Sequence, residues 1–441
     1  MRGQFKPAVL ALAVGTLMAA SGAANATNGY AMHGIGTKAK GMAGAGAAFP
    51  QDTLSMGTNP AGAVTLGGRI DAGLALFNPN RNYTVTGFPS GNPGTFGLNP
   101  RNTDSDSELF AVPEFGYNRM LGSDRSVGVA VFGNGGMNTD YPGFANMFCP
   151  PPGGTGSFCA GAAGINLSQL FITPTYAQKF AGGKASFGAS LVLVYQEFEA
   201  TGIGSFQQLS SDPTNLSDRG KERSTGVGVR LGVMGEVAPD VTLGATYAPK
   251  VSMSEFDKYS GLFAEQGGFD IPSNWSLALA WKTPLGGTLA FDVQGIQFSD
   301  IASVGNPLDP MTLASPMNPT GVLLGQNNGP GFGWDDMIVF KLGYQWTTSP
   351  DWTWRAGISV TDQPVASNQV LFNILAPAVV ETHISAGLTK KMGPNQELSA
   401  SLTHALNNSV KGSNSLEMPN QQTIELEMNQ WEVSVGYSWL F

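Results

Sequence analysis

The sequence has few charged residues and no long apolar run beyond its N-terminus. Asp, Glu, Lys and Arg make up only 12% of the 441 residues, about half the share found in typical globular proteins. After residue 26 we find no apolar stretch long enough for a membrane-spanning helix. Glycine is nevertheless abundant, with 59 residues, and the mean hydropathy is near zero, at −0.03. This composition favours a membrane β-barrel over a helical membrane protein or a soluble enzyme.

Sequence signals for catalysis and for nucleic-acid binding are also missing. The three histidines, His33, His383 and His404, are far apart in sequence and form no local motif. No nucleophile, zinc or phosphate-binding motif accompanies them, so we expect neither enzymatic activity nor a cofactor or metal. A net charge of −9 without a basic cluster argues against a nucleic-acid partner.

The first residues have the features of a secretory signal peptide. Arg2 and Lys6 precede a short apolar core, Ala8–Ala20, and Ala24–Ala26 forms a small-x-small cleavage site. The core is too short for the alternative, a membrane anchor. We therefore expect residues 1–26 to be removed on export.

Export also bears on the two cysteines, Cys149 and Cys159. An exported chain meets an oxidising compartment, which favours a disulfide between them within one loop. A pair of free thiols is the alternative. The nine residues between them do not fit a zinc site or a CxxC redox motif.

The last eleven residues, WEVSVGYSWLF, alternate with a period of two. Trp431, Val433, Val435, Tyr437, Trp439 and Phe441 form one face, and Glu432 with small residues forms most of the other. This pattern predicts a β-strand with one apolar face. Similar alternation, with charges confined to the second face, occurs in residues 227–233, 289–293, 338–346 and 352–360. A lipid-facing outside and a polar inside would produce it.

The connections between such segments alternate strictly in length. Six are short, near 121–125, 181–184, 238–240, 284–287, 349–351 and 392–396. Seven are long, near 78–107, 133–165, 201–223, 252–272, 302–333, 362–378 and 409–422. Outer-membrane barrels have short periplasmic turns and long outer loops. The fold class we expect is all-β, a 14-stranded antiparallel transmembrane β-barrel over residues 64–441.

Residues 27–63 do not fit a strand, because they are rich in Gly and Ala and lack sustained alternation. A barrel of about fourteen strands is wide enough to need filling, and small residues pack closely inside a lumen. We therefore predict an N-terminal hatch that plugs the barrel. A disordered periplasmic extension is the alternative.

At this point the sequence resembles the FadL/TodX (OmpP1) family of outer-membrane transporters for hydrophobic compounds. The hatch reads GMAGAGAAFPQDTLSMGTNPAGA, similar to the family's small-residue run followed by an acidic residue, here Asp52, and an Asn-Pro-Ala motif, here Asn59, Pro60 and Ala61. Other similar blocks are VFGNGGMNTDY, TYAPKVSMSEFDKYSG and WTWRAGISVTDQPVASNQ. The resemblance covers nearly the whole chain after the signal peptide.

The resemblance implies a mechanism. A hydrophobic solute is captured among the outer loops, enters a pocket inside the barrel and leaves sideways into the outer leaflet through a gap at a kink in the third strand. The three glycines Gly133, Gly135 and Gly136 would form that kink, although a flexible loop start also explains them. Asn59 and Pro60 would end the hatch and contact the kink, or would form only a turn.

Two sets of residues are candidate ligand contacts. Loop residues for the first capture step are Phe206, Leu209, Tyr259, Leu262 and Phe263. They would otherwise pack loop against loop. The inward cations Arg230, Lys341 and Arg355 would bind a carboxylate head group. Salt bridges with the inward acids Glu236, Asp292 and Glu432 are the plainer account of these charges, and we favour it.

The sequence therefore predicts a monomeric outer-membrane channel for passive uptake of hydrophobic small molecules, above all long-chain fatty acids. Outer-membrane lipid would receive the solute, and the terminal aromatic Phe441 resembles the signal read by the barrel assembly machinery. Uptake of aromatic hydrocarbons, a non-transporting adhesive or structural barrel, and a general diffusion porin are the alternatives. The hatch distinguishes them, because an adhesin needs no plug and diffusion porins are usually constricted by an inward loop.

Overall fold

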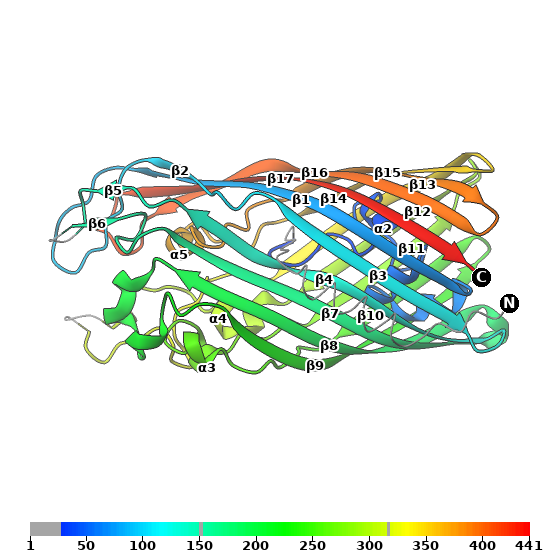
Figure 1. The fold of residues 1–441 in the computed structure, drawn as a ribbon, viewed down its shortest axis with the longest axis horizontal. Coiled ribbons are helices and arrows are strands. Elements are labelled where there is room, and N and C mark those ends of the chain that lie inside the picture. Colours follow the sequence, from blue (N-terminus) through cyan, green and yellow to red (C-terminus); the bar gives the residue numbers. More distant parts are fainter. Residues whose placement is uncertain (1–27, 150–152, 315–317) are drawn as a thin grey trace.

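The computed structural model describes residues 28–149, 153–314 and 318–441. The predicted signal peptide, residues 1–26, lies outside these residues. Figure 1 shows a long barrel of tilted strands, with the C-terminus at one end and the long loops at the other. No helix in the described part of the chain is long and apolar enough to cross a membrane.

Fourteen antiparallel strands form the closed barrel, which confirms the predicted fold class. Their order in the sheet follows their order along the described chain, and β1 pairs with β17 to close the ring. The strands are β1 (Arg69–Thr86), β3 (Phe110–Met120), β4 (Arg125–Tyr141), β7 (Ala163–Phe180), β8 (Ala185–Thr201), β9 (Glu222–Ala238), β10 (Val241–Ala248), β11 (Asn274–Lys282), β12 (Gly287–Ile296), β13 (Met337–Ser349), β14 (Trp352–Thr361), β15 (Thr382–Gly393), β16 (Gln396–Ser413) and β17 (Thr423–Leu440).

The other elements are short and lie before β1 or in the connections. Short strands are β2 (Asn102–Asp104), which pairs with β1, and the pair β5 (Ala145–Asn146) and β6 (Gly154–Thr155). The α-helices are α2 (Thr37–Lys40), α3 (Ala264–Gly267), α4 (Ala302–Gly305) and α5 (Val370–Asn373). The 3₁₀ turns are η1 (Thr53–Gly57), η2 (Pro60–Thr65), η3 (Ala181–Gly183), η4 (Gly204–Leu209), η5 (Pro213–Asn215), η6 (Asp257–Tyr259) and η7 (Phe298–Asp300).

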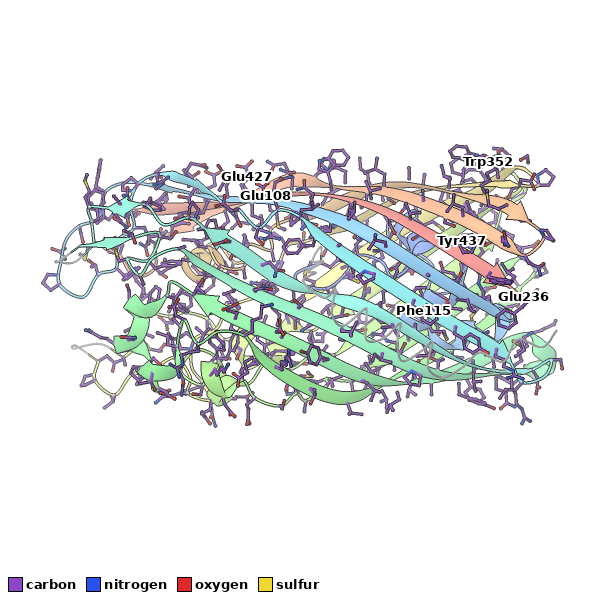
Figure 2. The ribbon with its side chains drawn as sticks, viewed as in Figure 1. Glu108, Phe115, Glu236, Trp352, Glu427 and Tyr437 are labelled. Carbon is purple, nitrogen blue, oxygen red and sulfur yellow. A yellow bond between two sulfur atoms is a disulfide. The ribbon has the colours of Figure 1, made fainter. Side chains whose placement is uncertain are left out.

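The alternation along β17 gives the barrel wall two unlike faces. Val433, Val435 and Tyr437 are 47%, 48% and 43% exposed on the outside, whereas Glu432 and Ser434 are buried inside. Figure 2 shows Tyr437 and Trp352 on the half of the wall near the short turns, and Glu108 and Glu427 nearer the long loops. The apolar band thus occupies only part of the barrel's length, and outward charges lie beyond it.

The short turns agree with the predicted positions, but three long connections begin later than predicted, including the last, since β16 continues to Ser413. Strand β1 continues to Thr86 and β4 continues to Tyr141, each still paired along its length. The reason is that these strand ends extend beyond the apolar band, so the alternation that marks a strand fades while the ladder of hydrogen bonds continues. As a correction, Gly133, Gly135 and Gly136 therefore lie within the third barrel strand and not after it.

The largest apolar core lies in the half of the molecule that carries the long loops. Its buried members include Tyr83, Phe198, Phe256, Trp334 and Val370, from strand ends and from several loops. The loops are therefore packed on one another and close over the outer end of the barrel. This packing positions the candidate binding residues described below.

The two-faced wall predicts a depth-dependent cost for charge on its outside. Val435 pairs with Leu74 and Ala400 in the middle of the band, so Val435→Arg should lower the free energy of unfolding from a lipid bilayer by about 2–4 kcal/mol. Thr423→Arg, at the outer end of the same face, should cost only about 0–1 kcal/mol. Urea unfolding in vesicles measures both, and equal costs would contradict the placement of the band.

Candidate functional site

Residues 28–66, here called the N-terminal segment, lie against the inner face of the barrel wall (Figure 1). Thr37 Oγ1 is 2.7 Å from Ser434 Oγ on β17, and Gly36 N donates to Glu114 on β3 at 3.2 Å. Ala43 N donates to Ser385 on β15 at 2.6 Å. These three strands lie in one arc of the ring, and Ser186 on β8, in another part of the ring, donates to Ala61 O of the segment at 2.9 Å.

A buried lysine of the segment, Lys40, forms ion pairs with glutamates on two strands of the wall. Lys40 Nζ lies 3.4 Å from Glu432 on β17 and 3.8 Å from Glu114 on β3, and its side chain is 0% exposed. Lys38 Nζ lies 2.6 Å from Glu397 on β16. Buried charges are costly without partners, so the segment and the wall carry complementary charges that depend on each other.

Burial also shifts two titrating groups of the segment. Burial and the neighbouring His383, Lys40 and Lys341 hold the pKa of His33 well below its usual value, so its imidazole is neutral at pH 7. Its ring stacks on His383 with centroids 5.6 Å apart. Burial and the nearby carboxylate of Asp71 raise the pKa of Asp52 to about 6. Asp52 caps η1 by accepting from Leu54 N at 3.1 Å.

The three predicted inward cations all bond to the N-terminal segment. Arg230 donates to Thr58 O at 3.3 Å, and Lys341 donates to His33 O at 2.9 Å. Arg355 donates to Gln51 Oε1 at 2.6 Å. In the described chain their partners at hydrogen-bond distance are thus mainly carbonyl and amide oxygens of the segment, and Glu236, Asp292 and Glu432 are not within ion-pair distance of them.

The Asn-Pro-Ala motif forms the start of η2 and packs on the wall. Asn59 caps the turn by accepting from Ala61 N at 3.1 Å, and its amide donates to Ala47 O at 2.7 Å. The motif needs glycine opposite it. A Cβ on Gly232 of β9 would lie 2.1 Å from Asn59 Oδ1, and one on Gly188 of β8 would lie 2.3 Å from the carbonyl carbon of Pro60.

The glycines of β4 mark a break in the wall. The pairing of β4 with β7 shifts register between Gly133 and Gly135, and Gly135 has φ of 136°. The pairing of β3 with β4 ends at Phe115 and Val131. A bulge and a lost partner strand therefore coincide in this stretch of the barrel.

Residues of the N-terminal segment bond to the bulge. Met32 N donates to Asn134 O at 3.0 Å, and Gly136 N donates to Tyr30 O at 3.1 Å. The resemblance implied that Asn59 and Pro60 would contact the kink. The backbone bonds to the bulge instead come from residues 30–32. The Asn59 amide donates to Val233 O on β9 at 3.5 Å. The segment passes the bulge early and reaches η2 only after crossing the lumen.

An apolar pocket, here called the outer pocket, lies among the long loops. It is lined mainly by Phe206, Leu262, Phe263, Ile165, Phe198, Leu216, Phe332 and Phe372, with an empty volume of about 510 Å³ that includes space open to solvent. Leu209 packs at the margin of the surrounding core. Tyr259 is fully buried, and its hydroxyl donates to Gly220 O and accepts from Ala200 N. The structure thus brings three of the five predicted loop residues to one pocket.

A second and more polar cavity, here called the inner chamber, lies between the N-terminal segment and strands β9 to β13. Its lining includes Tyr30, His33, Thr58, Asn134, Arg230, Asn274, Ser276, Asp292, Gln294 and Lys341. Arg230 and Lys341 reach it, whereas Arg355 is not among its lining residues. Asn134 connects the chamber to the bulge of β4.

Aromatic rings of the apolar core lie close to the inner chamber. The ring of Tyr30 lies 5.0 Å from Phe298, 5.9 Å from Trp334 and 5.8 Å from Phe269. Tyr30 also lines the inner chamber. Tyr30 therefore belongs both to the apolar core and to the lining of the chamber.

The two cysteines form a disulfide, and His404 stacks on an aromatic ring. Cys149 and Cys159 form a disulfide within the connection between β4 and β7, as predicted. His404 stacks on Trp431, with ring centroids 3.9 Å apart. Among the described residues no group of three or more His, Cys, Asp or Glu could hold a metal.

Sequence reasoning missed the contributions of Tyr30, His33 and Lys40. One signal was available, because Lys38 and Lys40 are the only charged residues in the stretch 27–51. A cation isolated in a small-residue segment requires an acidic partner if the segment is buried. Tyr30 and His33 carry no comparable signal, since their partners come from strands distant in sequence.

The chain matches the family model described as outer membrane protein transport protein (OMPP1/FadL/TodX) over residues 16–441. A comparison with curated proteins finds no match. The Pseudomonas putida toluene transporter TodX aligns with a TM-score of 0.64 at 17% identity, over 94% of this chain and 100% of that chain. The Ralstonia pickettii toluene transporter TbuX gives 0.63 at 17%, over 93% and 99%.

A Pseudomonas aeruginosa FadL homologue aligns with a TM-score of 0.65 at 16% identity, over 93% of this chain and 99% of that chain. At these identities the structural likeness shows the shared fold. Membership of the OMPP1/FadL/TodX family is shown by the match to the family model, which covers residues 16–441.

The ion pairs of the segment predict an uneven response to neutralisation. Lys40→Met leaves the carboxylates of Glu114 and Glu432 buried without their cation, and it should lower the free energy of unfolding by about 3–5 kcal/mol. Lys250→Met removes a half-exposed pair with Asp270 and should cost less than about 1 kcal/mol. Thermal and urea unfolding compare the two, and similar losses would refute the buried pairing.

Proposed function

Because the chain belongs to the OMPP1/FadL/TodX family of outer-membrane transport proteins, we propose that it is a channel for passive uptake of hydrophobic compounds, above all long-chain fatty acids. The protein is a multi-pass β-barrel of the outer membrane in a family of transport channels rather than enzymes. The observation that carries the proposal is the pairing of an apolar outer pocket with an inner chamber beside a break in the wall.

The outer pocket supports capture of an apolar solute. Phe206, Leu262 and Phe263 line it, and nearly all of its lining is apolar, as in small-molecule sites. Leu209 and Tyr259 support the surrounding loops. An adhesive or structural barrel would have no use for an apolar pocket among its loops and a second cavity within its lumen.

The inner chamber supports a fatty acid as substrate. Arg230 and Lys341 both line it, and each has hydrogens beyond the one bonded to the segment. A carboxylate would accept charge-assisted hydrogen bonds from them. In this proposal Arg355 has a different role, because it bonds to Gln51 and to Thr389 Oγ1 at 2.8 Å and holds the segment in place.

The segment 27–63 acts as the hatch in this proposal. Its contacts with strands around the ring block a straight path, and Asp52, Asn59, Pro60 and Ala61 form its capped turns. The solute leaves sideways at Gly133, Gly135 and Gly136, where β4 has lost β3 as a partner. Outer-membrane lipid then receives it.

The channel works as a monomer, since one ring closes on itself and holds both cavities. The assembly machinery of the outer membrane would recognise the C-terminal strand at Phe441, which is 61% exposed.

Aromatic hydrocarbons are the second candidate substrates. The layer formed by Tyr30, Phe269, Phe298 and Trp334 favours them, because planar rings stack well on it.

Binding of oleate and of toluene to the purified protein separates the two substrates. Both would compete with a fluorescent fatty acid, in a detergent that does not resemble a fatty acid. We expect oleate to bind and Arg230→Gln or Lys341→Gln to weaken it about tenfold or more, while Lys250→Gln has no effect. Toluene binding without oleate binding would move the proposal to hydrocarbons. If neither oleate nor toluene bound, the case for transport would be lost.

Deleting residues 27–63 tests the hatch. We expect the deletion to raise the passage of a small hydrophilic dye into liposomes, because the lumen loses its filling. If the deletion impairs folding, Lys40→Met provides a milder loosening and should give an intermediate rise, with Lys250→Met as control. Unchanged permeability in folded variants would show that the segment is not the barrier.

A further inference from the structure

The inner chamber is lined by oxygen atoms that have no partner. Asp292 Oδ1, Asn274 Oδ1, Gln294 Oε1 and the Tyr30 hydroxyl are all buried without a hydrogen-bond partner among the described residues, and all four residues line this chamber. A buried polar atom without a partner destabilises a fold. Several such atoms among the residues of one cavity indicate that a bound molecule supplies their hydrogen bonds.

Asp292 is the most defined of these groups. Its Oδ2 accepts from Gly46 N and Ala47 N, each at 2.9 Å, which fixes the carboxylate against the N-terminal segment. Its Oδ1 is buried and has no donor among the described residues, and Asp292 is one of the residues that line the chamber. Gln294 and Asn274 lie further along the inner faces of β12 and β11, toward the loops. The three therefore form one row on neighbouring strands.

The cations of the chamber differ from this row because each already donates to a backbone carbonyl. Arg230 bonds to Thr58 O and Lys341 bonds to His33 O. The buried side-chain atoms of β11 and β12 that have no partner among the described residues are all acceptors: Asn274 Oδ1, Asp292 Oδ1 and Gln294 Oε1. A pure hydrocarbon would leave them unsatisfied, and a carboxylate placed at Asp292 would meet a like charge.

We propose that the inner chamber also binds hydrophobic alcohols, with the ligand hydroxyl donating to Asp292 Oδ1 and lying within reach of Gln294. This inference rests on the proposed channel function and adds a substrate class to the same chamber. The hydroxyl satisfies the unpaired acceptor, and its alkyl chain extends toward the aromatic ring of Tyr30. The row of Asp292, Gln294 and Asn274 would thus admit uncharged ligands that carry a hydrogen-bond donor, in addition to any carboxylate held by Arg230 and Lys341.

The test compares ligands that differ only in a donor. 1-Tetradecanol, its methyl ether and tetradecane compete with a fluorescent fatty acid on the full-length mature protein. We expect the alcohol to bind about tenfold more tightly than the ether, because a hydrogen bond to a charged acceptor has that effect or more. The ether accepts but cannot donate, so the comparison isolates the direction of the hydrogen bond.

Two variants locate the effect. Asp292→Asn can keep the bonds to Gly46 N and Ala47 N while presenting a donor to the chamber, so the alcohol should lose its advantage over the ether. Gln294→Met should reduce that advantage severalfold without removing it. Thr246→Val is the matched control, since Thr246 Oγ1 is also buried and unpartnered but does not line the chamber. It should leave the advantage unchanged.

The outcomes separate this inference from the channel proposal. Equal binding of alcohol and ether by the unmodified protein, or an advantage that survives Asp292→Asn, would overturn the inference while binding of oleate kept the channel proposal intact. If neither oleate nor any of the three ligands displaced the probe, both would fall. Variants are compared only where their thermal unfolding matches that of the unmodified protein.

Discussion

Closure of the sheet is the constraint on which the rest of this structure depends. In lipid no water is available to satisfy a free strand edge, so every backbone group in the wall needs a partner strand. The pairing of β1 with β17, from Arg69 and Leu440 to Thr86 and Thr423, removes both edges of the sheet. Once fourteen strands close, the circumference is set, and with it a lumen too wide for wall side chains alone to fill.

That lumen explains the unusual distribution of charge. Lys40, Glu114 and Glu432 are buried far from water, although the chain has few charges overall. Each is tolerable only because the N-terminal segment brings an opposite charge to the wall. The segment is also held by apolar contacts, since Leu54, Met56 and Val64 pack in one core with Phe132, Phe171 and Val192 of the wall.

At the bulge of β4 the wall loses the pairing with β3, and the N-terminal segment bonds to the strand there. Past Val131, β4 has no partner in β3, and the bulge at Gly133 to Gly135 turns its backbone. Residues 30–32 supply the missing backbone partners there, and the ring of Tyr30 lies in the aromatic layer above the inner chamber. A movement of this short stretch would therefore change the lumen and the side gap together.

The sequence by itself determined the barrel, because period-two alternation and alternating connection lengths are local properties that follow from burial on one face. It also determined the loop disulfide and the existence of an unusual segment before the first strand. It did not determine that Arg230, Lys341 and Arg355 bond to that segment, that the β4 glycines lie inside a strand, or that residues 30–32 and not Asn59 bond to the bulge. Tertiary structure decided these. The bonds to the segment join residues a hundred or more positions apart, and such a partner leaves no periodic pattern in the sequence. The β4 glycines are held in a strand by pairing with β7.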